Sequence, residues 1–84
     1  MYYVYVLQSS KDGNLYVGFT KDLKNRVKQH NGGWVDSTKS RIPLKLIYYE
    51  GCLIKEDALT KEKYLKTTYG KRYLKSRLKN YFTG

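Results

Sequence analysis

The sequence predicts a small α+β fold in which strands and helices follow one another in the order β-β-α-β-α-α. Two patterns predict the strands: a hairpin-like stretch over residues 3–18 and the apolar run LKLIYY over residues 44–49. A third pattern, apolar residues at helical spacing, predicts helices over residues 21–30, 55–68 and 71–81. A chain of 84 residues is long enough for one modest core, so we expect a single domain over residues 1–84.

The hairpin is predicted by two runs of tyrosine and β-branched residues on either side of Lys11-Asp12-Gly13-Asn14. A two-residue turn centred on Asp12-Gly13 pairs Lys11 with Asn14, and this register sorts the side chains into two faces. The predicted core face is nearly pure hydrocarbon and holds Tyr2, Val4, Val6, Leu15, Val17 and Phe19. The other face is expected to leave a shallow surface with room for a ligand, and it holds Tyr5, Leu7, Tyr16 and Gly18. A loop wider by two residues leaves both faces unchanged.

The first predicted helix is the segment from Lys21 to His30. Thr20 is the expected N-cap, and Asp22 in the first turn favours the positive end of the helix dipole. Asn31-Gly32-Gly33 supplies a left-handed stop. The stripe that faces the sheet is formed by Leu23, Val27 and His30.

Arg26 and His30 lie one turn apart and are expected to point toward the edge of the sheet. Their position directly after the Tyr16-Val17-Gly18 strand makes them candidate site residues. The alternative is structural: the tyrosines suit half-buried strands, and Arg26 and His30 form a solvated, partly packed flank.

The loop over residues 33–43 is irregular and carries one large side chain, Trp34, which lies either under the loop or exposed to a partner. Lys39 and Arg41 make the loop basic, so we expect it to lie along a phosphate backbone. The strand that follows, Leu44 to Tyr49, is apolar throughout, which predicts a central or well-covered position in the sheet.

Glu62 is the most informative residue of the helix predicted from Lys55 to Thr68. The inward stripe consists of Ala58, Leu65 and Tyr69, and Glu62 lies within it. A buried carboxylate without a partner is costly, so Glu62 needs one. The two alternatives are a salt bridge to Arg26 or a lysine, and a hard divalent cation held by one carboxylate and water.

Gly70 is expected to end that helix, and Lys71 to Tyr81 forms a second, strongly basic one. The residues expected to face inward are Tyr73 or Leu74, Leu78 and Tyr81. The remaining charges form a surface suited to nucleic acid. The predicted nucleic-acid-binding residues are Lys39, Arg41, Lys66, Lys71, Arg72 and Lys75.

The net charge of +10 points to a polyanionic partner, and ten tyrosines are compatible with stacking on bases. An anionic membrane surface is the competing partner, but no apolar run approaches the length of a membrane span. The N-terminus also lacks the features of a signal peptide. One cysteine, Cys52, and no Cys/His cluster argue against a disulfide and structural zinc. We therefore expect a cytoplasmic protein without a membrane partner.

The ordered set of Tyr5, Tyr16-Val17-Gly18, Arg26, His30 and Glu62 resembles the GIY-YIG nuclease domain. Tyr3-Val4-Tyr5 corresponds to the first motif of that family and Tyr16-Val17-Gly18 to the second. The chain is most similar to the small, single-domain bacterial members, and the resemblance covers essentially all of it. It implies a three-stranded antiparallel sheet flanked by helices.

The resemblance also implies hydrolysis of DNA phosphodiester bonds with one divalent cation, Mg²⁺ or Mn²⁺. Carried over by position, Glu62 holds the metal, Arg26 binds the scissile phosphate and Tyr5 activates water as the general base. Tyr16 and His30 orient the phosphate and water or assist proton transfer. Such chemistry needs cations aimed at the phosphoryl oxygens, where charge develops in the transition state.

The chain departs from the family pattern at two places. Tyr3 stands where the family name has glycine, and Asn80 is the candidate for an asparagine that the family carries in its C-terminal helix.

The leading hypothesis is a metal-dependent endonuclease or nicking enzyme acting on DNA, with RNA left open as a substrate. The first alternative is a non-catalytic nucleic-acid-binding module on the same fold, and the second is a basic protein of a membrane surface or the ribosome. We expect a monomer or weak dimer, with a targeting partner protein as one source of specificity.

Overall fold

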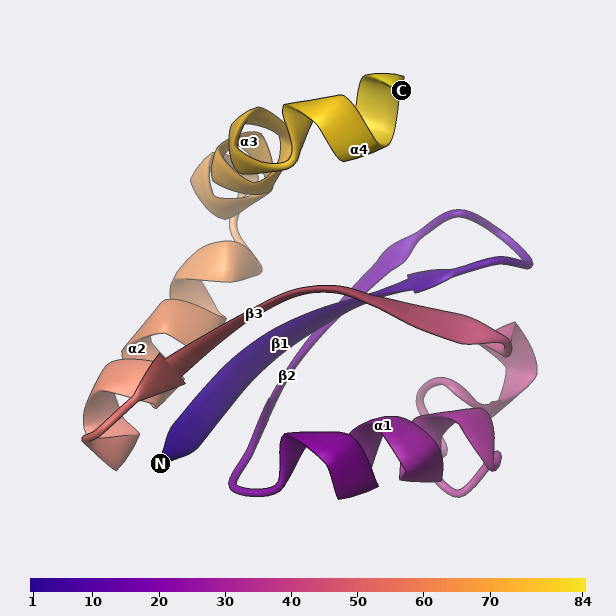
Figure 1. Cartoon of the computed structure of the whole chain (residues 1–84), viewed down its shortest axis with the longest axis horizontal. Helices are drawn as coiled ribbons and strands as arrows, with labels where there is room; N and C mark the ends of the chain where they lie inside the picture. Colours follow the sequence, from indigo (N-terminus) through magenta and orange to yellow (C-terminus); the bar gives the residue numbers. More distant parts are fainter.

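The computed structural model describes all residues from 1 to 84 and contains one three-stranded sheet with helices on both of its faces (Figure 1). The strands are β1 (Tyr2–Ser9), β2 (Leu15–Thr20) and β3 (Leu44–Cys52). The helices are α1 (Leu23–Asn31), the 3-10 helix η1 (Lys39–Arg41), α2 (Lys55–Leu65), α3 (Thr68–Arg77) and α4 (Lys79–Thr83). The predicted α+β fold class and its order of elements are confirmed. Every helix is too short and too polar to span a membrane.

The β1–β2 hairpin has a wider loop than the sequence predicts. Tyr5 pairs with Gly18, and the backbone N–H of Ser9 bonds to the carbonyl of Asn14 at 3.0 Å, so four residues form the loop. The buried hydroxyl of Ser9 favours this loop because it accepts the backbone N–H groups of Lys11 and Asp12 at 3.1 and 3.2 Å. The predicted two-residue turn is wrong. The two faces are nevertheless as predicted, because the register changed by two residues and side chains alternate with that period.

The strand order is β2-β1-β3, with both pairs antiparallel, so β1 is the central strand. Four consecutive residues of β1, Val4 to Leu7, are fully buried because helices cover β1 on both faces. In β3 only Leu44 is buried. The predicted central or well-covered position of the third strand is therefore wrong, since its apolar run lies at an edge.

Two clusters of apolar side chains hold the helices to the sheet. On one face, Val4, Val6 and Val17 pack against Leu65 of α2 and Leu74 of α3. This is the predicted core face, and it is confirmed. On the other face, α1 packs against Tyr5, Leu7 and Leu44 through Leu23 and Val27. That face was expected to be a shallow surface with room for a ligand, which is wrong at Tyr5 and Leu7 because α1 packs against both.

The N-cap of helix α1 lies two residues later than predicted. Asp22 is the N-cap, and its carboxylate accepts the backbone N–H of Asn25 at 3.2 Å. Thr20 instead accepts the backbone N–H of Asp22 at 3.1 Å, so the prediction of Thr20 as N-cap is wrong. The predicted left-handed stop is confirmed at Gly33, whose φ is +77°.

The second predicted helix ends earlier than Thr68, at Leu65. Thr67 caps α3 by accepting the backbone N–H of Gly70 at 3.1 Å, so Gly70 lies inside α3 and does not break a helix. It is buried, and a Cβ there would overlap the carbonyl oxygen of Tyr64 and lie 2.8 Å from the carbonyl carbon of Leu65. Glycine at this position therefore allows α2 and α3 to approach closely.

The early end of α2 also moves Tyr69 to a new helix. It is 69% exposed, so its predicted place in the inward stripe is wrong. The predicted helix over residues 71–81 is divided at Leu78 into α3 and α4. Leu74 is buried as predicted, whereas Tyr81 is 41% exposed and donates its hydroxyl to the side chain of Gln8. Trp34 was expected to lie either under the loop or exposed, and it is 82% exposed.

Candidate active site

The candidate site is organised by Tyr5, which is fully buried in the central strand. Its hydroxyl lies 2.8 Å from Nε2 of His30, and Nε of Arg26 donates to the same oxygen at 3.4 Å. Gly18 makes this arrangement possible: a Cβ at Gly18 would overlap Cζ and the hydroxyl of Tyr5 and lie 2.8 Å from its Cε2. Gly18, the glycine of the second motif, therefore leaves the space that the ring of Tyr5, the tyrosine of the first motif, fills.

Tyr16 is the phenol of the site that reaches the surface. Its ring centroid lies 5.0 Å from the ring of His30 and 6.4 Å from the ring of Tyr5. Tyr16 is partly exposed, whereas Tyr5 and His30 are both 0% exposed. A ligand in the site would therefore contact Tyr16 before Tyr5.

Burial raises the pKa of Tyr5, although the hydrogen bond from Arg26 opposes this effect. Smaller contributions that also raise the pKa come from the charges of Tyr16 and Glu62. Tyr5 is therefore a neutral phenol at physiological pH, and its position favours structural support over the removal of a proton from water.

His30 has hydrogen-bond partners at both ring nitrogens: Tyr5 at Nε2, and the Thr38 hydroxyl at Nδ1, 2.7 Å away. Burial, followed by the positive charge of Arg26, lowers the pKa of His30 from 6.5 to about 4. The imidazole is therefore neutral near pH 7.

This burial predicts a loss of stability in mild acid. Because the folded pKa of His30 is about 4 and the unfolded value 6.5, the unfolded chain binds more protons between these values. The contribution of the neutral His30 side chain to the free energy of unfolding is fully present above pH 6.5. It is lost as the pH falls toward 4. We expect the free energy of unfolding to drop by about 1.5 kcal/mol between pH 6.5 and 5, a range above the titration of most carboxylates. Urea denaturation at both pH values measures it.

The control for this prediction is His30→Gln, whose side chain hydrogen-bonds but does not titrate. The variant is expected to lose most of the drop between the two pH values. A wild-type protein equally stable at pH 6.5 and 5 would contradict the burial of a neutral histidine.

Glu62 lies on α2 with its side chain 20% exposed, and its Oε2 forms an ion pair with Nζ of Lys66 at 3.3 Å. The partners expected for Glu62 were a basic side chain or a divalent cation, and Lys66 is a partner of the first kind. The structure has no group of three or more His, Cys, Asp or Glu side chains that could hold a metal. The donor set therefore suits no zinc-type site. It fits an ion such as Mg²⁺, which binds through one or two carboxylates and keeps water and substrate phosphate as its other ligands.

Three of the predicted nucleic-acid-binding residues line two adjoining grooves, one of which Tyr16 also lines. Lys66 and Lys71 line a groove of about 280 Å³ between β2 and the helices, and Tyr16 lines the same groove. Lys71 and Lys75 line an adjoining groove of about 470 Å³ beside the hairpin loop. Because Lys71 is common to both grooves, the lysines form a continuous basic track that starts at Tyr16.

The other three predicted binding residues are placed elsewhere. Lys39 forms an exposed ion pair with Asp36 at 3.5 Å, and Arg41 is paired with Asp12 of the hairpin loop at 3.1 Å. The guanidinium of Arg72 lies over the ring of Tyr69, 5.9 Å from its centre. None of the three lines the basic track.

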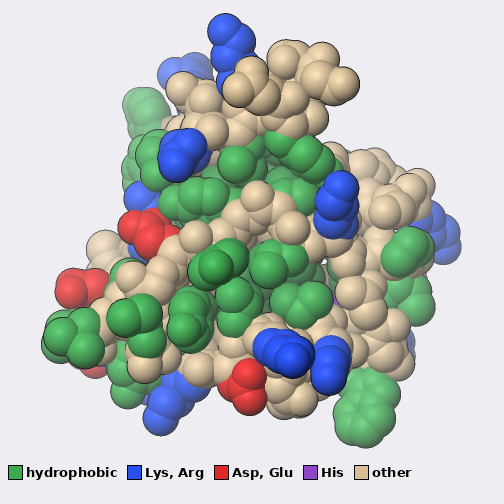
Figure 2. Space-filling view, in the orientation of Figure 1, with side chains coloured by type: hydrophobic (Ala, Val, Ile, Leu, Met, Phe, Trp, Pro, Cys, Tyr) green, Lys and Arg blue, Asp and Glu red, His purple; other side chains and the backbone are tan.

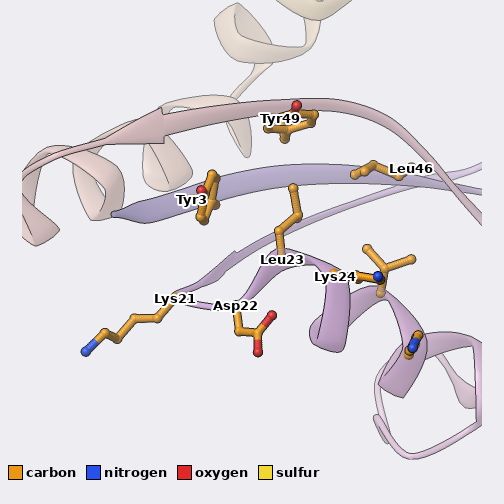
Figure 3. Close-up of a pocket in the computed structure, with 9 residues that line it drawn as sticks. Tyr3, Lys21, Asp22, Leu23, Lys24, Leu46 and Tyr49 are labelled. Carbon is orange, nitrogen blue, oxygen red and sulfur yellow. The ribbon is translucent and has the colours of Figure 1, made fainter.

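A larger groove of about 680 Å³ lies between α1 and the β3 side of the sheet. In Figure 3, Tyr3, Leu23 and Tyr49 point toward one another in it, while Lys21 extends away. Figure 2 shows hydrophobic side chains gathered over the middle of this face of the molecule. The groove contains none of the five candidate catalytic residues, so it is a separate surface. No motif indicated it, because its walls come from three elements distant in sequence.

Sequence reasoning also missed residues that hold the site together. Gln29 accepts a hydrogen bond from Nη1 of Arg26 at 3.0 Å, a contact that its spacing of three residues on a helix could have indicated. Thr38 had no such signal, because it lies in the loop after α1. Asn80, the candidate for the family asparagine, is exposed in α4, and its side chain forms no hydrogen bond to the cluster.

The GIY-YIG catalytic domain matches residues 1–80 of the chain. A UPF0213 protein of Streptococcus pneumoniae is 43% identical over 65 residues, which are 76% of this chain and 65% of that relative. A UPF0213 protein of Staphylococcus saprophyticus is 39% identical over 75 residues, 88% of this chain and 90% of the relative. The matched region is thus less than two thirds of the length of the streptococcal relative. No solved structure matches the chain.

The three-stranded sheet and the tyrosine–arginine–histidine cluster are consistent with this domain match. The chain belongs to the GIY-YIG catalytic domain family, and its relatives include bacterial UPF0213 proteins. The resemblance inferred from the sequence is therefore confirmed. Nucleases of this family typically use a divalent cation.

Proposed function

We propose that the protein is a metal-dependent endonuclease that hydrolyses DNA phosphodiester bonds by nicking or cutting a strand. The observation that carries this proposal is the hydrogen-bonded cluster of Tyr5, His30 and Arg26, beside Tyr16 at the end of the lysine track. Membership of the catalytic domain family supports it.

Arg26 is the residue proposed to bind the scissile phosphate. Its Nε is held by Tyr5 and its Nη1 by Gln29, while Nη2 makes no hydrogen bond within the protein. The guanidinium is therefore oriented before substrate arrives and keeps donors available for a phosphoryl oxygen. Preorganised donors of this kind stabilise the charge that develops in the transition state.

Glu62 is the residue proposed to hold Mg²⁺ or Mn²⁺, with the remaining ligands supplied by water and phosphate. A divalent ion bound there would neutralise phosphoryl charge and lower the pKa of coordinated water. Lys66 is 56% exposed, so its side chain has solvent space in which to move away from Glu62.

Tyr16 is proposed as the phenol that contacts substrate and the attacking water. Tyr5, the base expected from the family resemblance, is better placed as support for Arg26, because it is fully buried and burial raises its pKa. A general base must reach its water within hydrogen-bond distance. The partly exposed Tyr16 meets that requirement more readily than Tyr5.

The proposed substrate is a DNA strand along Lys66, Lys71 and Lys75, which lead away from Tyr16. Lysines on this track would release counterions from the backbone, so binding should weaken steeply with salt. RNA stays open as a substrate. The second candidate is a binding module without catalysis, favoured by the absence of any group of three or more side chains that could hold a metal.

Plasmid nicking separates the two candidates. We expect the wild-type protein to convert supercoiled plasmid to the nicked form with Mg²⁺ or Mn²⁺ and to stop when a chelator is added. Arg26→Ala is expected to lower this rate by about 10²–10³-fold, because a preorganised phosphate donor is lost. Arg77→Ala, which removes an exposed arginine from α3, is the matched control.

Two results would contradict the nuclease. If the wild-type protein shifts DNA on a gel without cutting it at any metal concentration, the protein is a binding module. If Arg26→Ala cuts as fast as wild type, any cleavage arises from another site or a contaminant.

A further inference from the structure

The buried hydroxyl of Thr38 bonds to the candidate site and not to the helix that Thr38 precedes. Thr38 is the N-cap residue of η1, yet its side chain makes no capping hydrogen bond. The hydroxyl lies 2.7 Å from Nδ1 of His30 instead, and both residues are 0% exposed. The side chain that would ordinarily cap the short helix is thus committed to the histidine of the candidate site.

The contact continues as a chain of hydrogen bonds from the loop to the phosphate-binding arginine. Thr38 contacts Nδ1 of His30, Nε2 of His30 contacts the Tyr5 hydroxyl at 2.8 Å, and Nε of Arg26 donates to that hydroxyl. A neutral imidazole has one donor and one acceptor nitrogen, so the direction of one bond sets the direction of the other.

The bond from Arg26 indicates that direction. Because the Tyr5 oxygen already accepts from a guanidinium, its own O–H is the group left to donate, and Nε2 of His30 is the acceptor in reach. A phenol is also a stronger donor than the aliphatic hydroxyl of Thr38. Nε2 is then unprotonated, and the hydrogen on Nδ1 is donated to Thr38.

We propose that Thr38 is a positioning residue that holds His30 in the Nδ1–H tautomer, so that Tyr5 directs its proton at His30 and an oxygen lone pair at Arg26. In the opposite tautomer, Nε2–H and the guanidinium would both donate to the Tyr5 oxygen, and the phenol proton would point away from His30. Thr38 therefore orients Arg26 through two intermediate side chains. The tautomer assignment stands on the hydrogen bonds alone, whereas its effect on cleavage rests on the proposed function.

The first test is spectroscopic and uses the fact that His30 is the only histidine in the chain. In a ¹⁵N-labelled protein at pH 7, long-range ¹H–¹⁵N spectra report which ring nitrogen carries the hydrogen. We expect protonated Nδ1 and unprotonated Nε2 in the wild-type protein. Thr38→Val keeps the shape and removes the acceptor; since buried N–H groups without an acceptor are rare, its ring should shift toward the Nε2–H form.

Thr38→Ser restores the hydroxyl and is expected to restore the Nδ1–H tautomer. Thr60→Val is the matched control, because it makes the same change at an exposed position of α2. In the nicking assay, Thr38→Val is expected to lower kcat by about 10- to 100-fold with little change in KM, since misplaced groups slow chemistry more than binding. Thr38→Ser should recover the rate.

The proposal is overturned if the wild-type ring is in the Nε2–H form, or if Thr38→Val leaves the tautomer unchanged. If Thr38→Val does not fold, the wild-type and Thr38→Ser spectra decide. If the protein proves not to cut DNA, the tautomer readout is unaffected, so failure of the nuclease function is distinguishable from failure of this inference.

Discussion

Glu62→Gln is expected to lower metal-dependent nicking by about 10²–10³-fold, as much as Arg26→Ala. The amide has nearly the shape of the carboxylate but lacks the charge that holds a divalent ion. The structure offers no group of three or more His, Cys, Asp or Glu side chains as an alternative metal site. The measurement is the rate of plasmid nicking across a range of Mg²⁺ and Mn²⁺ concentrations.

The same substitution is expected to leave the fold almost unchanged. Glu62 forms only a surface ion pair with Lys66, and such pairs on a helix contribute about 0.3–0.5 kcal/mol. Glu56→Gln is the matched control, because it removes the same charge from an exposed position on α2. Nicking by Glu62→Gln at the rate of the Glu56→Gln control would show that Glu62 is not the metal ligand.

Gly18→Ala is expected to disrupt the site by displacing the ring of Tyr5. The new Cβ would overlap the end of the Tyr5 ring, and Tyr5 is fully buried, so the ring cannot move aside without leaving His30 and Arg26. We expect nicking to fall by about 10²-fold, because groups displaced by about 1 Å lose that much. Overpacking should also destabilise the protein by about 1–3 kcal/mol. Urea denaturation and the nicking assay measure the two effects.

Gly32→Ala is the control, since it adds the same methyl group at the end of α1. Its Cβ would lie 3.0 Å from the ring of Trp34, which is 82% exposed and free to move. The control should therefore change stability far less than Gly18→Ala. Equal effects of the two substitutions would mean that contact with Tyr5 is not what requires glycine at position 18.

The lysine track and the groove of about 680 Å³ lie on opposite sides of the sheet. The lysine track begins at Tyr16 beside the edge strand β2, and the larger apolar groove lies between α1 and the opposite edge strand, β3. Strand β1 lies between these two edge strands. Tyr49 of this groove pairs with Tyr5 across β1 and β3, so the groove shares the central strand with the proposed catalytic cluster.

The sequence by itself determined the order of strands and helices and the membership of the two sheet faces. Alternation along a strand has a period of two, so Tyr5 and Tyr16 share a face even though the predicted turn was two residues too short. Helical spacing likewise placed His30 and Arg26 on the side of α1 that meets the sheet. The ordered set of site residues was enough to indicate the family, which the match over residues 1–80 confirms.

Only the tertiary structure decided which of these side chains is buried, and what each one contacts. The apolar run of β3 is no more marked in sequence than that of β1, yet β1 is central because both other strands pair with it. The break between α2 and α3 falls at Thr67, since Gly70 is needed where the two helices touch. Thr38 meets His30 because a loop folds back over the site. Such contacts join residues without a fixed spacing, so no local pattern encodes them.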